Sequence, residues 1–138
     1  MTKLGVFLPV GNRGWIISKT SPKTEPSFAL NKSVVTRAEF FGFDFGLAMI
    51  KYRGFGETRY WEDNLEAFTV ISGLAAISNR MSFYASIPLL AVPPAVAARM
   101  AMTMDSIAPG RIGVNIVTGW QPAEYTQMGL WPGDEYFK

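Results

Sequence analysis

The chain has 138 residues, of which 49% are hydrophobic and 17% charged, and this composition is typical of a globular chain with room for one domain. Its formal net charge is only +2 and its Lys and Arg residues are scattered singly, so no basic stripe suggests a nucleic-acid partner. It contains no cysteine and no histidine, which excludes disulfides, thiolate nucleophiles, a Ser-His triad and Cys- or His-ligated metal sites within these residues.

The hydrophobic pattern predicts strands and helices in alternation. Leu4–Val10 is a short apolar run that predicts a first strand, and residues 11–27 form a loop rich in Gly, Pro, Ser and Thr. A helix is expected from Leu30, because apolar residues then recur at near-helical spacing. Asn31 is its expected N-cap and Gly42 lies at its expected C-terminal end.

The second part of the chain continues this alternation. Phe43–Met49 predicts a second strand, and a polar loop then leads to a helix with Asn64 as its expected N-cap. Met81–Pro88 predicts a third strand. Pro93-Pro94 suits the first turn of a helix, and Arg111–Thr118 predicts a fourth strand.

These strands are nearly continuous in apolar residues, which is typical of parallel strands buried on both faces and indicates the α/β class. The residues alone leave two architectures open, a doubly wound open sheet and a (β/α)8 barrel. The segment Gly11-Asn12-Arg13-Gly14-Trp15 does not match the Gly-x-Gly-x-x-Gly fingerprint of a dinucleotide-binding sheet. A complete barrel needs about 250 residues, so this chain would supply four of its eight units.

Candidate functional residues follow from the class, because the sites of α/β folds form at the C-terminal ends of strands. The second strand ends with Met49, Ile50 and Lys51, and the third contains Ser86. In and after the fourth strand come Asn115, Thr118, Gly119, Trp120 and Glu124.

Several of these residues also have an ordinary structural interpretation. Met49 is typical of a core residue, and Lys51 of a solvated strand end. Ser86 fits a hydrogen bond to a backbone carbonyl, and Glu124 fits the first turn of a helix.

Asn115 is the exception, because it interrupts an apolar strand. A buried amide without a partner costs about 1–3 kcal/mol, so this position favours a role facing a ligand. Trp120 fits a core residue and a flat wall for a planar ligand equally well.

The sequence resembles the luciferase-like flavin monooxygenases and, more narrowly, the pyrimidine (uracil) monooxygenases. The resemblance rests on the stretches GVFLPVGNRGWIIS, FDFGLAMIKYRGFG, WEDNLEAFT, PPAVAARMAMTMDSI and, most specifically, GRIGVNIVTGWQPAEYTQMGLWPGDEYF. It implies that residues 1–138 are the N-terminal portion of a single luciferase-like (β/α)8 TIM-barrel domain, with about four parallel strands and their helices.

The resemblance also implies an activity. Members of this family use reduced FMN and O2, and the pyrimidine enzymes oxygenate and open a ring such as uracil or thymine. A separate NADH-dependent flavin reductase supplies the reduced FMN, so this reductase and a small pyrimidine are the implied partners. The alternatives are a related flavin monooxygenase that acts on a sulfone or another heterocycle, and a non-catalytic half-barrel that self-associates through its open sheet edge.

Site residues are implied by the same resemblance. The FMN-contacting positions are Ile50, Lys51, Asn115 and Glu124, and the catalytic ones are Met49, Ser86, Asn115 and Trp120. Ser86 stands where the family usually has a threonine, and Pro88 departs from the family pattern. An Arg-Tyr pair that contacts FMN in the family would lie beyond Lys138.

No run of residues reaches the roughly 20 apolar residues that span a membrane, and polar residues interrupt the N-terminal apolar run too early for a signal peptide. We therefore expect a cytoplasmic protein with no membrane partner. Because the sequence has no Cys and no His, we also expect no metal site. Because a half-barrel has an open sheet edge, we also expect homo-oligomers.

Overall fold

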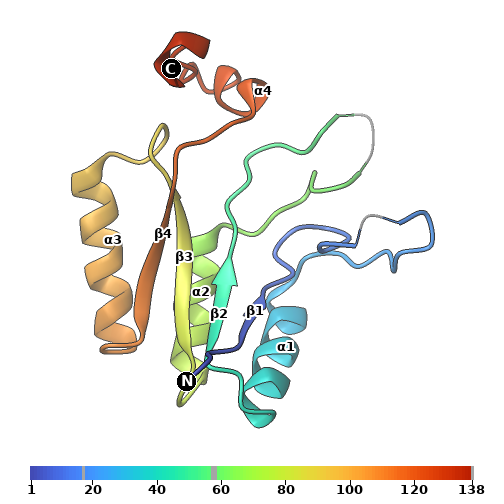
Figure 1. Cartoon of the computed structure of the whole chain (residues 1–138), viewed down its shortest axis with the longest axis vertical. Coiled ribbons are helices and arrows are strands. Elements are labelled where there is room, and N and C mark those ends of the chain that lie inside the picture. The colour runs from blue at the N-terminus through green and yellow to red at the C-terminus, as the bar shows by residue number, and fades with distance from the viewer. Residues whose placement is uncertain (17, 57–58, 138) are drawn as a thin grey trace.

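Four parallel strands form one sheet in the chain order β1-β2-β3-β4 (Figure 1). They are β1 (Gly5–Phe7), β2 (Phe45–Ala48), β3 (Ser82–Pro88) and β4 (Ile112–Val117). The structure is a computed structural model that describes residues 1–16, 18–56 and 59–137. The predicted α/β class with four parallel strands is confirmed.

Each strand lies within its predicted run but is shorter than it. The largest difference is in β1, which the sequence predicted to extend to Val10. The Leu8 amide still donates to the Leu47 carbonyl at 2.8 Å, but the next backbone amide on that side, that of Val10, donates back to the Leu8 carbonyl at 2.9 Å and not to β2.

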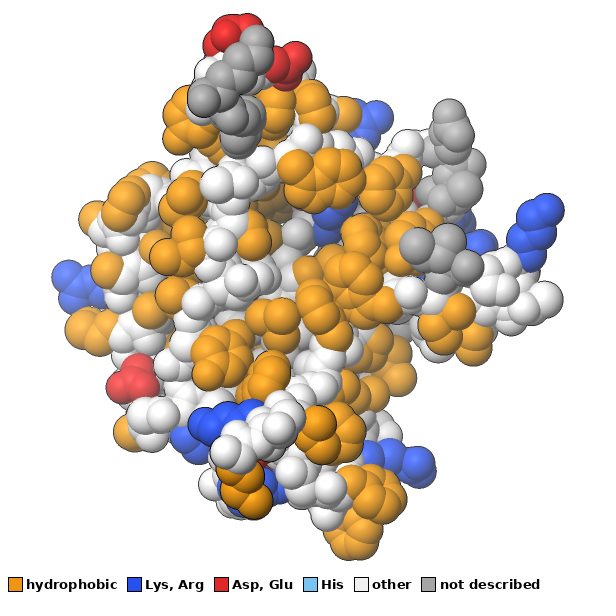
Figure 2. All heavy atoms as spheres, viewed as in Figure 1, with side chains coloured by type: hydrophobic (Ala, Val, Ile, Leu, Met, Phe, Trp, Pro, Cys, Tyr) orange, Lys and Arg blue, Asp and Glu red, His pale blue; other side chains and the backbone are white. Residues whose placement is uncertain are grey.

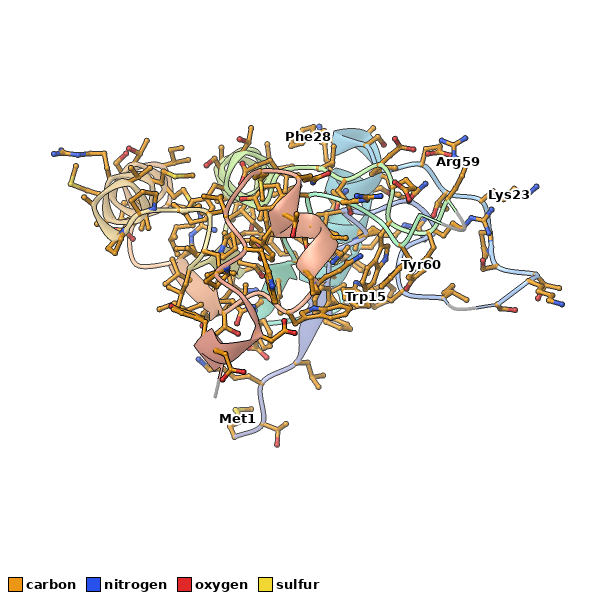
Figure 3. All side chains as sticks on the ribbon, turned by 90° about the horizontal axis from the view of Figure 1, so that it is seen from above. Met1, Trp15, Lys23, Phe28, Arg59 and Tyr60 are labelled. Carbon is orange, nitrogen blue, oxygen red and sulfur yellow. The ribbon has the colours of Figure 1, made fainter. Side chains whose placement is uncertain are left out.

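Three helices connect the strands, and all lie on one side of the sheet (Figures 1 and 3). They are α1 (Phe28–Phe40), α2 (Ala67–Ile77) and α3 (Pro94–Ile107). The short helix α4 (Pro122–Thr126) and the 3-10 turn η1 (Asp134–Phe137) follow β4. Right-handed crossovers between strands in sequential order place every helix on the same face, whereas a doubly wound sheet must reverse direction. This strand order therefore favours the barrel over the open sheet.

Two predicted helix caps are wrong. The N-cap of α1 is Ser27, while Asn31 is fully buried inside the helix and donates to the Pro9 and Ser27 carbonyls. The N-cap of α2 is Glu66, whose carboxylate accepts two amides of the first turn, while the Asn64 side chain donates to the Trp61 carbonyl. Both asparagines follow the pattern of a cap, but Asn31 joins α1 to the loop after β1, and Asn64 makes a hydrogen bond within its own loop.

The core lies between the helices and the sheet. Its largest fully buried side chains include Leu8, Ile71, Leu74, Phe83 and Met104. Burying such side chains stabilises the fold by about 1.5–3 kcal/mol each. None of the helices in the described parts of the chain is both long and apolar enough to cross a membrane.

The other face of the sheet carries exposed hydrophobic side chains, and Figure 2 shows this face. Phe7 is 43% and Tyr84 is 38% exposed there. A Cβ atom on Gly113 would lie 2.4 Å from the Tyr84 ring, so glycine is needed for this ring to lie across the neighbouring strand. The sheet is therefore covered on one face only within the described chain.

Candidate functional site

A cavity of about 310 Å³ opens at the C-terminal ends of β2, β3 and β4. This volume lies at the lower end of the roughly 300–1,000 Å³ of small-molecule sites. Its lining includes Gly119 but not Thr118, and it includes all seven residues that the family resemblance implies, namely Met49, Ile50, Lys51, Ser86, Asn115, Trp120 and Glu124. The structure therefore brings together residues that lie up to 75 positions apart.

Asn115 and Ser86 lie directly opposite each other on β4 and β3. The Asn115 side-chain amide donates to the Ser86 hydroxyl at 3.0 Å, and this hydroxyl donates to the Ala48 carbonyl at 2.8 Å. The predicted bond from Ser86 to a backbone carbonyl is confirmed. This chain of bonds fixes the amide of Asn115, while its carbonyl oxygen accepts no hydrogen bond from the described residues. The oxygen thus remains available to a donor in the cavity.

Lys51 and Glu124 form a buried ion pair. Their side chains are 4% and 5% exposed, and Nζ of Lys51 lies 2.7 Å from Oε2 of Glu124. Glu124 does lie in the first turn of α4, but the interpretation of Lys51 as a solvated strand end is wrong. The tertiary fold buries them because each supplies the opposite charge that makes burial of the other tolerable.

Two further groups, which the sequence did not reveal, complete the network around this pair. The Tyr52 amide donates to Oε1 of Glu124 at 2.6 Å. Gln121 accepts a hydrogen bond from Lys51 and donates to the Gly54 carbonyl at 3.2 Å. The segment after β4 is therefore bonded to the loop after β2 at several points. Only the nearness of Gln121 to Glu124 in the chain could have suggested its role.

The Lys51 ammonium also lies beneath aromatic rings. Its Nζ is 4.8 Å from the centre of the Trp120 ring and 5.6 Å from that of Phe55, both within the range of cation–π attraction. Trp120 itself is 67% exposed, so it forms a wall of the cavity and not part of the core. Met49, by contrast, is 8% exposed and serves both the core and the cavity lining.

Tyr125 closes the floor beside this network. Burial, together with the negative charge of Glu124, raises the pKa of its hydroxyl to about 12, so the ring stays neutral at physiological pH. Gly119 has φ +85, and a Cβ there would lie 2.7 Å from the Tyr125 ring. Glycine is thus required both by the turn after β4 and by the close approach of this ring.

A second cavity, of about 700 Å³, adjoins the first. The two cavities share Trp15, Trp61 and Trp120 in their linings. Trp15 and Tyr60 both lie close to Trp61, with ring centres 4.5 and 4.7 Å from it, and Figure 3 shows Trp15 and Tyr60 next to each other. Sequence reasoning missed this aromatic cluster, and the available signal was the density of aromatic residues between β2 and α2, where Tyr52, Phe55, Tyr60 and Trp61 follow one another closely.

Residues 2–137 match the sequence model of a family described as luciferase-like monooxygenase. The chain is 59% identical over 136 residues to the pyrimidine monooxygenase RutA of Caulobacter segnis. That alignment covers 98% of this chain and 39% of the relative, so the chain spans well under half of the relative's length.

Two solved structures have a similar fold. The EDTA monooxygenase EmoA of Chelativorans sp. BNC1 superposes with a TM-score of 0.81 at 13% identity, over 98% of this chain and 34% of that one. The oxygenating constituent of the 3,6-diketocamphane monooxygenase of Pseudomonas putida, solved with FMN, gives 0.72 at 17% identity, over 96% and 34%. At these identities the likeness concerns the fold alone, and it confirms four parallel strands of a (β/α)8 barrel.

Proposed function

The chain belongs to the luciferase-like monooxygenase family, and on this premise we propose that it contributes to an enzyme that uses reduced FMN and O2 to oxygenate and open a pyrimidine ring such as uracil or thymine. The observation that carries the proposal is the cavity at the strand ends, where every residue implied by the family resemblance lies. The 59% identity to a pyrimidine monooxygenase supports a pyrimidine over the sulfone alternative.

The lining of the smaller cavity fits a flavin ring. The ring system is planar, apolar on its faces and polar along one edge. Trp120 offers a flat apolar wall, and the Asn115 carbonyl oxygen, without a donor among the described residues, offers an acceptor for a ring N–H. The Lys51–Glu124 pair supplies a fixed polar side to the same space. The smaller cavity therefore offers the flat apolar surface and the polar groups that a flavin ring requires.

In this proposal the protein and the cofactor have separate tasks. FMN, when bound, supplies the reaction with oxygen. Asn115 orients the ring, Ser86 holds the Asn115 amide in place, and Trp120 and Met49 keep water from the cavity. Lys51 and Glu124 bind the cofactor and fix the segment that carries Trp120.

The family resemblance extends the proposal to the surroundings of the enzyme. We infer that a separate NADH-dependent flavin reductase supplies the reduced FMN, that the enzyme is a homo-oligomer, and that it acts in the cytoplasm. The same reasoning makes residues 1–138 the N-terminal portion of one barrel domain.

Titration of the natural full-length protein with FMN tests the proposal. We expect binding of FMN, and uracil-dependent consumption of O2 once the flavin is reduced. Replacement Asn115→Ala should weaken FMN binding by about tenfold, the equivalent of one lost hydrogen bond to a polar ring edge. Asn79→Ala, at an exposed asparagine outside both cavities, should leave FMN binding unchanged. A protein that binds no flavin, or that consumes no oxygen with uracil, contradicts the proposal.

A further inference from the structure

The larger cavity offers a second binding space directly beside the proposed flavin cavity. Its lining is dominated by aromatic rings from two loops and from the segment after β4, and it shares three tryptophans with the smaller cavity. With about 700 Å³, it is large enough for a small heterocycle as well as the solvent around it. A molecule in it would lie next to whatever the smaller cavity holds.

Hydrogen bonds join the described parts of the two loops that build this cavity. The Trp61 indole N–H donates to the Gly14 carbonyl at 2.7 Å. The backbone amide of Asn12 donates to the backbone carbonyl of Asp63 at 2.9 Å. Trp61 has φ 61, a left-handed backbone that is unfavourable for a bulky side chain. Surrounding structure must enforce such a backbone, and sites of this kind cluster where a ligand is positioned.

Charged and polar side chains also line the larger cavity; with Ser18, Lys19 and Ser21, one of them is Arg13. It lines the larger cavity but not the smaller one, and its backbone is also left-handed, with φ 64. Its guanidinium has no hydrogen bond or ion pair with the described residues. An arginine side chain carries five N–H donors and no acceptor, so its partners are carbonyl or anionic oxygens.

We propose that the larger cavity binds the substrate ring, a planar nitrogen heterocycle with carbonyl oxygens, with Trp15 and Trp61 contacting the ring and Arg13 donating to a carbonyl oxygen. This inference rests on the proposed function, which supplies the flavin in the adjoining cavity. Stacking on an aromatic side chain contributes binding free energy but does not select among planar rings. A hydrogen bond from Arg13 distinguishes rings that have a carbonyl oxygen from rings that have none. Arg13 is thus a specificity-determining residue in this proposal.

The test uses steady-state kinetics and FMN titration of the natural full-length protein, with uracil as the probe. Arg13→Asn removes the guanidinium but keeps a residue that tolerates the left-handed backbone, and Trp15→Leu removes a ring that is 43% exposed. We expect each replacement to raise KM for uracil by about tenfold or more. For Arg13→Asn, which lines the larger cavity and not the smaller one, the Kd for FMN should stay within about twofold of the natural protein. Arg37→Gln and Phe40→Leu, exposed on α1 and outside both cavities, are the matched controls and should change neither constant.

The outcomes separate this inference from the proposed function. If the natural protein binds FMN and consumes uracil while KM in both variants stays within about twofold, the proposed function stands and the substrate site is wrong. A parallel rise in KM and in the Kd for FMN in Arg13→Asn also overturns it, because the larger cavity would then belong to the flavin. A natural protein without FMN binding or uracil turnover removes both proposals together.

Discussion

At the scale of single residues, the Lys51–Glu124 pair depends most directly on the tertiary fold. Both side chains are about 95% buried, and the tertiary fold supplies each with its partner. Replacing Lys51→Met leaves a buried carboxylate uncompensated, which should lower the free energy of unfolding by about 3–5 kcal/mol. Urea denaturation followed by tryptophan fluorescence measures this loss in the natural protein.

The double variant Lys51→Met with Glu124→Leu is the control for this prediction. It removes both charges, so we expect it to be more stable than Lys51→Met alone, despite losing the bond from the Tyr52 amide. Additive losses from the two single variants would contradict the ion-pair interpretation.

Seven residues that line the smaller cavity could be predicted from the sequence, because parallel strands end at a common edge. Their partners could not be, because the pairing of Lys51 with Glu124 joins positions 73 residues apart. Nothing in either local pattern distinguishes a buried charge from a solvated one. Trp15 and Trp61 were missed for the same reason, since only loop packing brings them to the cavity.

At the scale of elements, the Glu39 carboxylate clamps the end of α1 to the loop before β3. Its Oε1 accepts the Ser78 hydroxyl at 2.8 Å and the amides of Asn79, Arg80 and Met81 at 3.1, 2.6 and 3.1 Å. Burial raises the pKa of this carboxyl, but the hydrogen bonds from Ser78 and the backbone amides outweigh burial and hold the pKa below its ordinary 4.5. The charged form is therefore the one that the fold favours.

Because the pKa is lower in the folded state than in the unfolded one, the clamp stabilises fully above pH 4.5, and its contribution is lost as the pH falls through the lowered pKa. We expect Glu39→Gln to cost about 1 kcal/mol at neutral pH, since the site is partly solvated. Urea denaturation of both proteins should show this difference shrinking below pH 4.5. Glu25→Gln, at an exposed position, should give no such change, and a pH-independent difference for Glu39→Gln would contradict the clamp.

The element types followed from the sequence, since apolar runs and helical spacing reflect burial directly. Caps were harder to predict, because Ser27 and Asn31 lie within four residues of each other and both can cap. The choice depends on which side chain finds a tertiary partner. Asn31 bonds to the Pro9 carbonyl, and that contact depends on where the loop after β1 runs.

At the scale of the whole molecule, the sequential strand order leaves one face and two edges of the sheet uncovered within the described chain. Along the β4 edge, Val114 is 39% and Ile116 is 62% exposed. An unpaired, apolar edge strand is a template for pairing with another chain. When residues 1–138 are produced alone, we therefore expect association that increases with concentration in analytical ultracentrifugation.

A charged substitution on this edge distinguishes edge pairing from nonspecific hydrophobic association. Ile116→Lys should weaken the association of residues 1–138 by about tenfold, because pairing would bury an uncompensated ammonium. Met102→Lys, at a side chain 59% exposed on α3, adds the same charge away from the edge and should leave the association unchanged. Equal effects of the two replacements would point to nonspecific hydrophobic contact, and a monomer at all concentrations would show that the open edge is not adhesive. In the longer relatives, further strands of the barrel would pair with this same edge, so its apolar character follows from the barrel architecture.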